Sequence, residues 1–277
     1  MPASSKPIAL VTGASSGIGR TSSIALIKAG WRVVLSGRRK EELETTAEMA
    51  RKALREDGKE DDSNDDQLVL VAVGDVSQES NVKEMFEQIK QVYGRLDLLF
   101  NLRKQSNDVP HMQNAGISGK AIPLEDLDIQ DYLSVMAINV TASVICTQYA
   151  TRIMKEQTPQ GGRIINNGSI AAYSPRPNAT SYTISKHAIS GLTKSTSLDG
   201  RKYNIAACQL DIGNAATAMG GGAANGVPQP DGTSKPEATF DVEEVGRAIV
   251  YMASLPLGAN VFNMTLMATT MPFIARG

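Results

Sequence analysis

The chain has 277 residues, of which 42% are hydrophobic and 21% are charged. This balance is typical of a globular protein and the length suits one large α/β domain, so we expect residues 1–277 to form a single domain. The formal net charge is -1, which argues against nucleic acid or an anionic membrane as a partner.

Targeting signals, membrane spans and metal sites are not evident in the sequence. Met1 to Lys6 is too short and too polar for a signal peptide, and no apolar run reaches the roughly 18 residues of a membrane span. We therefore expect a cytoplasmic protein. Cys146 and Cys208 lie far apart in apolar segments without metal-type spacing, so we interpret them as buried thiols and predict no metal site.

Apolar runs alternate with helix-compatible stretches in the first part of the chain. Strands are expected at residues 7–11, 32–36, 68–73 and 96–100, and helices at 20–29, 40–57 and 81–93. Strands that alternate with helices indicate a parallel sheet with helices on both faces.

The same alternation continues in the second part, where the helices are longer. We expect helices at 129–156 and 181–198, and strands at 163–169, 205–210 and 260–267. The whole pattern predicts an α/β fold, a doubly wound parallel β-sheet of the Rossmann type with about seven strands. Ligands bind such sheets beyond the carboxyl ends of the strands, so residues distant in sequence would meet in one cleft.

A glycine-rich turn follows the first expected strand. Thr12 to Gly19 reads T-G-A-S-S-G-I-G and leads into a helix-compatible stretch that Gly30 closes. Glycines let the backbone approach a pyrophosphate, and the N-terminus of a helix supplies free N–H groups and partial positive charge. The glycines fall in the pattern T-G-x-x-x-G-x-G, which differs from G-x-G-x-x-G. The alternative is a sharp corner without a ligand.

A tyrosine and a lysine stand four residues apart in the segment Ser181 to Lys186. On a helix Tyr182 and Lys186 share a face, so a phenol and an ammonium can reach one small volume. We expect the adjacent cation to lower the tyrosine pKa and let it exchange protons with an alcohol or a carbonyl. Ser169 ends a short apolar run, which indicates a hydroxyl at the end of a buried strand. Taken alone, such a pair usually forms an ordinary helix face.

These motifs together resemble the short-chain dehydrogenase/reductase family, from about Pro7 to Arg276. Isoleucine replaces the family's usual proline in the segment Ile212 to Thr217. The matching positions are Gly13, Ser15, Ser16, Gly17, Ile18 and Gly19 in the cofactor loop, Asp75 and Val76 after the third strand, the helix residue Asn139, the catalytic residues Ser169, Tyr182 and Lys186, and Gly213 and Thr217 after the sixth strand.

The resemblance implies an oxidoreductase that transfers a hydride between NADP(H) or NAD(H) and a small-molecule carbonyl or secondary alcohol. Tyr182 would be the general acid or base, while Lys186 would favour the tyrosinate and hold the nicotinamide ribose. Ser169 would hydrogen-bond the reacting oxygen. Asn139 would position a water in the proton relay that leads to the lysine, and a helix-packing amide is the alternative.

The end of the second expected strand bears on the choice of cofactor. NAD-preferring members of the family carry an acidic residue there, which binds the ribose 2′-hydroxyl and would repel a 2′-phosphate. Gly37 takes that place, and Arg38 follows with a guanidinium that can bind phosphate through paired hydrogen bonds. We therefore expect NADP(H) to be preferred, with NAD(H) as the alternative. On the other interpretation, Arg38 and Arg39 only begin a solvated helix.

The family's N-N-A-G turn after the fourth strand is split in this chain. Residues 102–113 separate Asn101 from Asn114-Ala115-Gly116. Either this insert loop bulges outward and Asn114 to Gly116 resume the family's position against the cofactor, or it displaces the turn and impairs cofactor binding. The second interpretation leads to the alternative function, a catalytically impaired binding or scaffold protein.

Two further expectations concern the substrate and the assembly. Residues 218–239 are rich in glycine, alanine and proline and fall where the family places its substrate lid, so we expect a flexible closing loop. The family commonly forms dimers or tetramers through helices that correspond to residues 130–156 and 181–198. We therefore expect a homodimer or homotetramer.

Overall fold

A computed structural model of the chain describes residues 6–59, 62, 65–102, 121–217 and 222–274. Its centre is a seven-stranded sheet in the order β11-β6-β5-β4-β1-β2-β3, in which every adjacent pair is parallel. The seven strands are β1 (Ile8–Thr12), β2 (Arg32–Gly37), β3 (Val69–Val73), β4 (Leu98–Asn101), β5 (Gly162–Ser169), β6 (Ile205–Ile212) and β11 (Asn263–Leu266). This arrangement confirms the predicted doubly wound sheet of the Rossmann type.

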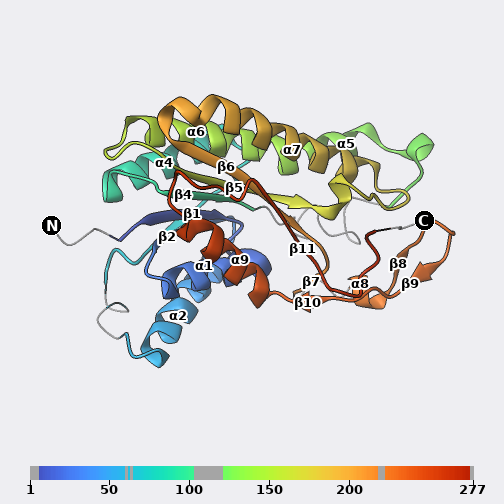
Figure 1. The fold of residues 1–277 in the computed structure, drawn as a ribbon, viewed down its shortest axis with the longest axis horizontal. Helices are drawn as coiled ribbons and strands as arrows, with labels where there is room; N and C mark the ends of the chain where they lie inside the picture. The colour runs from blue at the N-terminus through green and yellow to red at the C-terminus, as the bar shows by residue number, and fades with distance from the viewer. Residues whose placement is uncertain (1–5, 60–61, 63–64, 103–120, 218–221, 275–277) are drawn as a thin grey trace.

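Helices cover both faces of the sheet (Figure 1). One layer contains α1 (Gly17–Lys28), α2 (Lys40–Glu56) and α9 (Glu243–Ser254). The opposite layer contains α4 (Glu79–Tyr93), α5 (Ile129–Met136), α6 (Ala142–Glu156) and α7 (Thr180–Gly200). Each layer packs its own cluster of buried apolar side chains against the sheet, so the core lies on both sides of the strands.

The strands β5 and β6 are buried at every residue, yet both carry polar side chains. Asn166 and Asn167 lie in β5, and Gln209 and Asp211 lie in β6. Because a buried polar group without a partner is costly, these residues require hydrogen bonds inside the protein. The sequence pattern marked the two segments as strands but gave no sign of these partners.

The predicted helix at 129–156 is present but is not uniform. A π-helical turn, Ala137–Thr141, separates α5 from α6, and such turns are frequent at functional sites. The run Ile129–Glu156 is also long and apolar enough to cross a membrane by composition, with a mean hydropathy of 1.3 in its most apolar window. Here α6 packs against α4 and against strands of the sheet, so part of its apolar surface has a protein partner.

The remaining elements are short. The 3-10 turns are η1 (Leu124–Asp126), η3 (Ile170–Ala172) and η4 (Arg201–Tyr203). The region after β6 contains β7 (Ala215–Ala216), α8 (Gly222–Asn225), β8 (Val227–Pro228), β9 (Ser234–Lys235) and β10 (Phe240–Asp241). These elements lie at one end of the sheet (Figure 1), and they include the described part of the predicted lid.

Candidate active site

The turn between β1 and α1 has the conformation that its glycines predict. Gly13 and Gly17 have φ values of 68° and 50°, which L-residues with a side chain rarely adopt. A Cβ atom at Gly19 would collide with the carbonyl oxygen of Gly13. Only glycine therefore allows α1 to begin this close to the turn, which leaves the backbone N–H groups of the helix start open to an anion. The turn fits the pyrophosphate of a dinucleotide.

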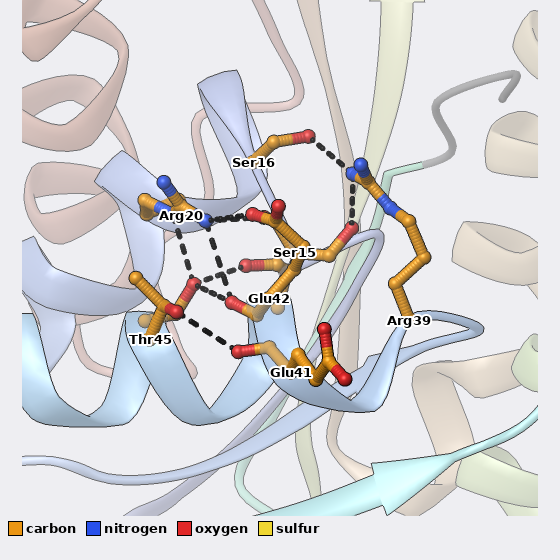
Figure 2. Close-up of polar contacts among 9 residues, drawn as sticks. Ser15, Ser16, Arg20, Arg39, Glu41, Glu42 and Thr45 are labelled. Carbon is orange, nitrogen blue, oxygen red and sulfur yellow. Dashed lines mark hydrogen bonds and ion pairs between the residues drawn. The ribbon is translucent and has the colours of Figure 1, made fainter. Parts of the chain in front are cut away.

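A cluster of polar side chains surrounds this turn, as Figure 2 shows. The guanidinium of Arg39 donates to the hydroxyls of Ser15 and Ser16, both at 3.1 Å. Arg20 donates to the carbonyl oxygen of Ser15 at 2.7 Å and to the carboxylate of Glu42 at 2.6 Å. The cluster thus joins the turn to the start of α2 and places a cation beside the two serines.

Arg39 was not among the predicted cofactor residues, which included its neighbour Arg38. Arg38 lies instead beside Asp75, with 4.0 Å between Nη1 and Oδ2. The sequence has two basic residues in succession at this point, and that pattern could have added Arg39 to the predicted cofactor residues. Their side chains diverge because the chain turns from β2 into α2 at this point, and only the three-dimensional structure distinguishes them.

The residues after β3 form a tight polar turn. Asp75 accepts hydrogen bonds from the backbone N–H and the hydroxyl of Ser77, at 2.9 and 2.7 Å, while its own N–H donates to the side chain of Asn81. Val76 packs against the apolar cluster beneath α4. Asp75 and Val76 therefore lie, as predicted, at the same edge of the sheet as the glycine turn.

The chain is firmly held up to the start of the predicted insert. Asn101 is buried and donates to Thr147 and to Asn166, both at 2.9 Å. The N–H of Leu102 donates to the hydroxyl of Thr12 at 3.0 Å. The predicted cofactor residues Asn114, Ala115 and Gly116 lie outside the described residues, so the two interpretations of the split turn both stay open.

Ser169, Tyr182 and Lys186 come together beside the carboxyl end of β5. Ser169 is the last residue of that strand; its hydroxyl accepts from the N–H of Ala171 at 3.1 Å and lies close enough to the Tyr182 phenol to lower its pKa. Lys186 is buried and donates from Nζ to the carbonyl oxygen of Asn167 at 2.9 Å. Its Nζ lies 5.5 Å from the centre of the Tyr182 ring. The predicted convergence of strand serine, helix tyrosine and helix lysine is therefore present.

The expected effect on the tyrosine is wrong in direction. The pKa of Tyr182 is raised, because burial of the phenol outweighs the lowering effect of nearby Ser169, and the charge of Asp211 acts in the same direction as burial. Burial likewise lowers the pKa of Lys186 to about 8, against an opposing effect of Asp211. Helical spacing indicated the neighbouring cation but not the loss of water around both groups, which dominates here.

Asn139 lies in the π-helical turn and faces the helix that carries the tyrosine. Its side-chain amide donates to the hydroxyl of Ser185 at 3.0 Å, and that hydroxyl donates to the carbonyl oxygen of Tyr182 at 2.7 Å. The four predicted catalytic residues thus belong to one packed unit. The contact is compatible with both roles considered for Asn139.

The predicted residues after β6 border the region expected to be a lid. The N–H of Gly213 donates to Leu266 at 2.9 Å, and a Cβ atom at Gly213 would lie 2.9 Å from Met267. Close packing against the strand end thus explains this glycine. Thr217 follows β7 at the edge of the described residues.

The described part of the region predicted to be a lid contains a buried carboxylate, Glu237, that sequence patterns did not indicate. Arg176, between β5 and α7, donates two hydrogen bonds of 2.6 Å to Glu237. Asn214 and Gln229 also donate to Glu237, both at 3.0 Å. Although burial raises the pKa of Glu237, these donors and the Arg176 charge outweigh it and lower the pKa to about 2. The region predicted to be a lid is thus tied to the segment between β5 and α7.

The sequence profile of the family described as short chain dehydrogenase matches residues 7–226. The chain belongs to this family, as its motifs predicted. A relative, the 3beta-hydroxysteroid dehydrogenase of Mediterraneibacter gnavus, is 35% identical over 192 residues. That match covers 69% of this chain and 60% of the length of the relative.

Solved structures have the same fold. The alcohol dehydrogenase of the archaeon Thermococcus sibiricus, complexed with 5-hydroxy-NADP, has a TM-score of 0.74 and 20% identity, and the match covers 96% of this chain and 98% of that one. The 3-ketoacyl-(acyl-carrier-protein) reductase of Brucella melitensis, complexed with NADH, has a TM-score of 0.75 and 21% identity, with 95% and 98% covered. At this identity the similarity shows the fold alone.

Proposed function

We propose that this protein is an oxidoreductase that transfers a hydride between NADP(H) and a carbonyl or secondary alcohol, with Tyr182 as the general acid or base. The observation that carries the proposal is the convergence of Ser169, Tyr182 and Lys186 beside the carboxyl end of β5. The glycine turn after β1 lies at the same edge of the sheet and fits a dinucleotide.

The site suits proton donation from the hydroxyl of Tyr182. Because its pKa is raised, the phenol carries its proton at neutral pH and can give it to a carbonyl oxygen. Ser169 lies at the end of β5 and acts on the pKa of this phenol, which supports a role in hydrogen-bonding the same substrate oxygen. Lys186, in its charged form, would stabilise the tyrosinate that remains. The nicotinamide supplies the hydride when it is bound.

The preference for NADP(H) rests on charges around the glycine turn. Arg38 and Arg39 both lie after β2, and Arg39 is hydrogen-bonded to Ser15 and Ser16. Gly37 offers no carboxylate to repel a 2′-phosphate, and a Cβ atom there would lie 3.6 Å from Cβ of Ser15. Asp75 offsets part of the Arg38 charge, so we assign the larger share of phosphate binding to Arg39. Solved structures of similar fold contain either an NADP derivative or NADH, so the fold does not determine which cofactor binds. We therefore base the choice on the charges beside the turn.

Cofactor titration followed by a turnover assay tests this proposal. Addition of the protein to NADPH should enhance the cofactor fluorescence and shift it to the blue, more strongly than with NADH. A panel of ketones and aldehydes, followed at the NADPH absorbance band, should then contain substrates. Absence of binding at millimolar NADPH and NADH would reject the enzyme and favour the scaffold alternative.

We further propose that the chain acts as one domain and as a homodimer or homotetramer in the cytoplasm. The outer surfaces of α5, α6 and α7 expose large apolar side chains, among them Ile129, Leu133, Val144 and Ile184. Apolar surface of this kind supports subunit contact. Light scattering coupled to size-exclusion chromatography measures the oligomeric state, and a monomer at micromolar concentration would contradict this part of the proposal.

A further inference from the structure

Four amide side chains form a row across the sheet on the side covered by α6 and α7. Asn101, Asn166, Gln209 and Asn263 are register partners in β4, β5, β6 and β11. Asn101 donates to Asn166 at 2.9 Å, and Thr193 of α7 links Asn166 to Gln209 with bonds of 2.9 and 3.2 Å. These bonds give Asn166 and Gln209 buried partners, whereas Oδ1 of Asn167 has no hydrogen-bond partner in the described part of the chain.

Asp211 lies two residues beyond Gln209 on β6, beside this row, and is completely buried. Gln209 donates to its Oδ1 at 2.7 Å. The phenol of Tyr173 and the amide of Asn263 donate to its Oδ2 at 3.0 and 2.6 Å. All three partners are donors, which suits a carboxylate because a carboxylate only accepts hydrogen bonds. The fold has thus built a site for a buried negative charge.

This carboxylate lies against the strand segment that carries the catalytic contacts. Asp211 is the register partner of Gly168, and a Cβ atom at Gly168 would collide with its Oδ1. The residue before Gly168 is Asn167, whose carbonyl oxygen accepts the Lys186 hydrogen bond. The residue after it is Ser169, whose side chain acts on the pKa of Tyr182. Any side chain at position 168 would therefore displace Asp211 from this backbone.

The charged and titratable groups around this site come from α7 and from the segments that flank it in space. Tyr182 and Lys186 of α7 are acted on by the Asp211 charge, and Tyr173 follows η3. Arg176 also acts on Tyr182 but is itself paired with Glu237. On the outer side of α7, His187 and Lys194 line a hollow of about 320 Å³ that also borders Gln209 and Asn263. These two side chains are exposed, so solvent screens their charges more than that of Asp211.

We propose that Asp211 is a positioning residue for the proposed reaction. Its carboxylate fixes the backbone from Asn167 to Ser169 and acts as the buried counter-charge that keeps Lys186 protonated. The inference rests on the proposed function, because it concerns the residues assigned to proton transfer.

The counter-charge role has a consequence for pH dependence. Asp211 raises the pKa of Lys186 and of Tyr182, so its removal lowers both. Carbonyl reduction needs a charged Lys186 and a protonated Tyr182, and both forms are lost as the pH rises. Removal of the Asp211 charge therefore moves the alkaline decline of reduction to lower pH, whichever of the two groups limits the rate.

The test compares Asp211→Asn with the wild-type chain in NADPH-dependent carbonyl reduction between pH 5.5 and 9.5. Asp199→Asn is the matched control. Asp199 is an exposed acid near the C-terminal end of α7, the helix that carries Tyr182 and Lys186. For each protein we take the ratio of kcat/KM at pH 8.5 to kcat/KM at pH 6. We expect this ratio to be at least about threefold lower in Asp211→Asn than in wild type, which corresponds to a modest pKa shift. The control should follow wild type.

Three other outcomes would overturn the proposed role of Asp211. A folded Asp211→Asn with an unshifted alkaline limb overturns the proposal and leaves the proposed function intact. Wild-type protein that neither binds NADPH nor reduces any carbonyl overturns both. If Asp211→Asn does not fold, Asp211→Ser replaces it in the same assay. Failure of both variants to fold, while Asp199→Asn folds, assigns Asp211 to folding alone and overturns the proposal.

Discussion

Lys186 donates from Nζ to the main-chain carbonyl of Asn167 at 2.9 Å. The lysine beside the proposed proton donor is therefore anchored to the strand that ends in Ser169. This contact couples α7 to β5 through a buried cation, so substitutions on either element are expected to change the chemistry as well as the packing.

Replacement of Tyr182 by phenylalanine removes the proposed proton donor and little else. We expect carbonyl reduction to slow by about two to four orders of magnitude, the contribution typical of general acid catalysis. NADPH binding, measured by fluorescence, should stay close to wild type. Tyr149→Phe provides a control, since Tyr149 lies on α6 with its ring 5.6 Å from that of Phe86. Unchanged turnover in Tyr182→Phe would falsify the assignment.

The pH profile of the wild-type enzyme should report the buried lysine. Burial lowers the pKa of Lys186 to about 8, so its charged fraction is high at neutral pH and falls as the pH rises through that value. Because kcat/KM reports groups of the free enzyme, carbonyl reduction should decline above about pH 8. A rate that stays level to pH 10 would show that the charge of Lys186 is not required.

Substitution of Arg39 should separate the two nicotinamide cofactors. We expect Arg39→Ala to weaken NADPH binding by about tenfold or more, the scale of one lost charge-assisted hydrogen bond of roughly 1.5–3 kcal/mol, with little effect on NADH. Arg38→Asp, which adds a repulsive charge, should favour NADH. The control is Arg55→Ala at the exposed end of α2. Equal losses for both cofactors would argue against a 2′-phosphate contact.

The ion pair between the half-buried Arg176 and the buried Glu237 should stabilise the predicted lid. Glu237→Gln leaves Arg176 without its partner charge, so we expect a loss of about 3 kcal/mol in the free energy of unfolding and a higher KM for the carbonyl. Glu244→Gln breaks only the exposed pair with Arg247 and should cost below about 1 kcal/mol. Denaturant unfolding measures both. Similar losses in the two variants would contradict the anchoring role.

The same pair predicts the direction of acid destabilisation. The folded pKa of Glu237 is about 2, below its ordinary value of 4.5, so its contribution is complete above pH 4.5 and is lost as the pH falls toward 2. Unfolding curves at pH 6 and pH 3 should therefore differ more for wild type than for Glu237→Gln. An identical pH dependence in both proteins would be evidence that the pair does not form.

Deletion of residues 102–113 tests the two interpretations of the split turn. The deletion joins Asn101 to Asn114-Ala115-Gly116 and restores the family's N-N-A-G order. If the insert bulges outward, NADPH affinity should change by less than about threefold, because loop length alone has a small free-energy effect. A large gain in affinity would instead indicate that the insert displaces the turn.

The sequence by itself determined the features that depend on local chain geometry. The order of strands and helices follows from hydrophobic periodicity, and the turn from Gly13 to Gly19 follows from glycines that permit positive φ and close approach. The spacing of Tyr182 and Lys186 places them on one helix face. Each inference involves residues that are neighbours along the chain, and motif recognition then supplied the family.

Only the tertiary structure decided the features that depend on register and burial. The contact of Asp211 with Gly168 exists because β5 and β6 pair in one register, and the ion pair of Arg176 with Glu237 joins positions 61 residues apart. The direction of the Tyr182 pKa shift likewise reflects removal of water from the whole site. A local pattern specifies which groups are present, whereas solvent exclusion and long-range pairing determine the charge each group carries.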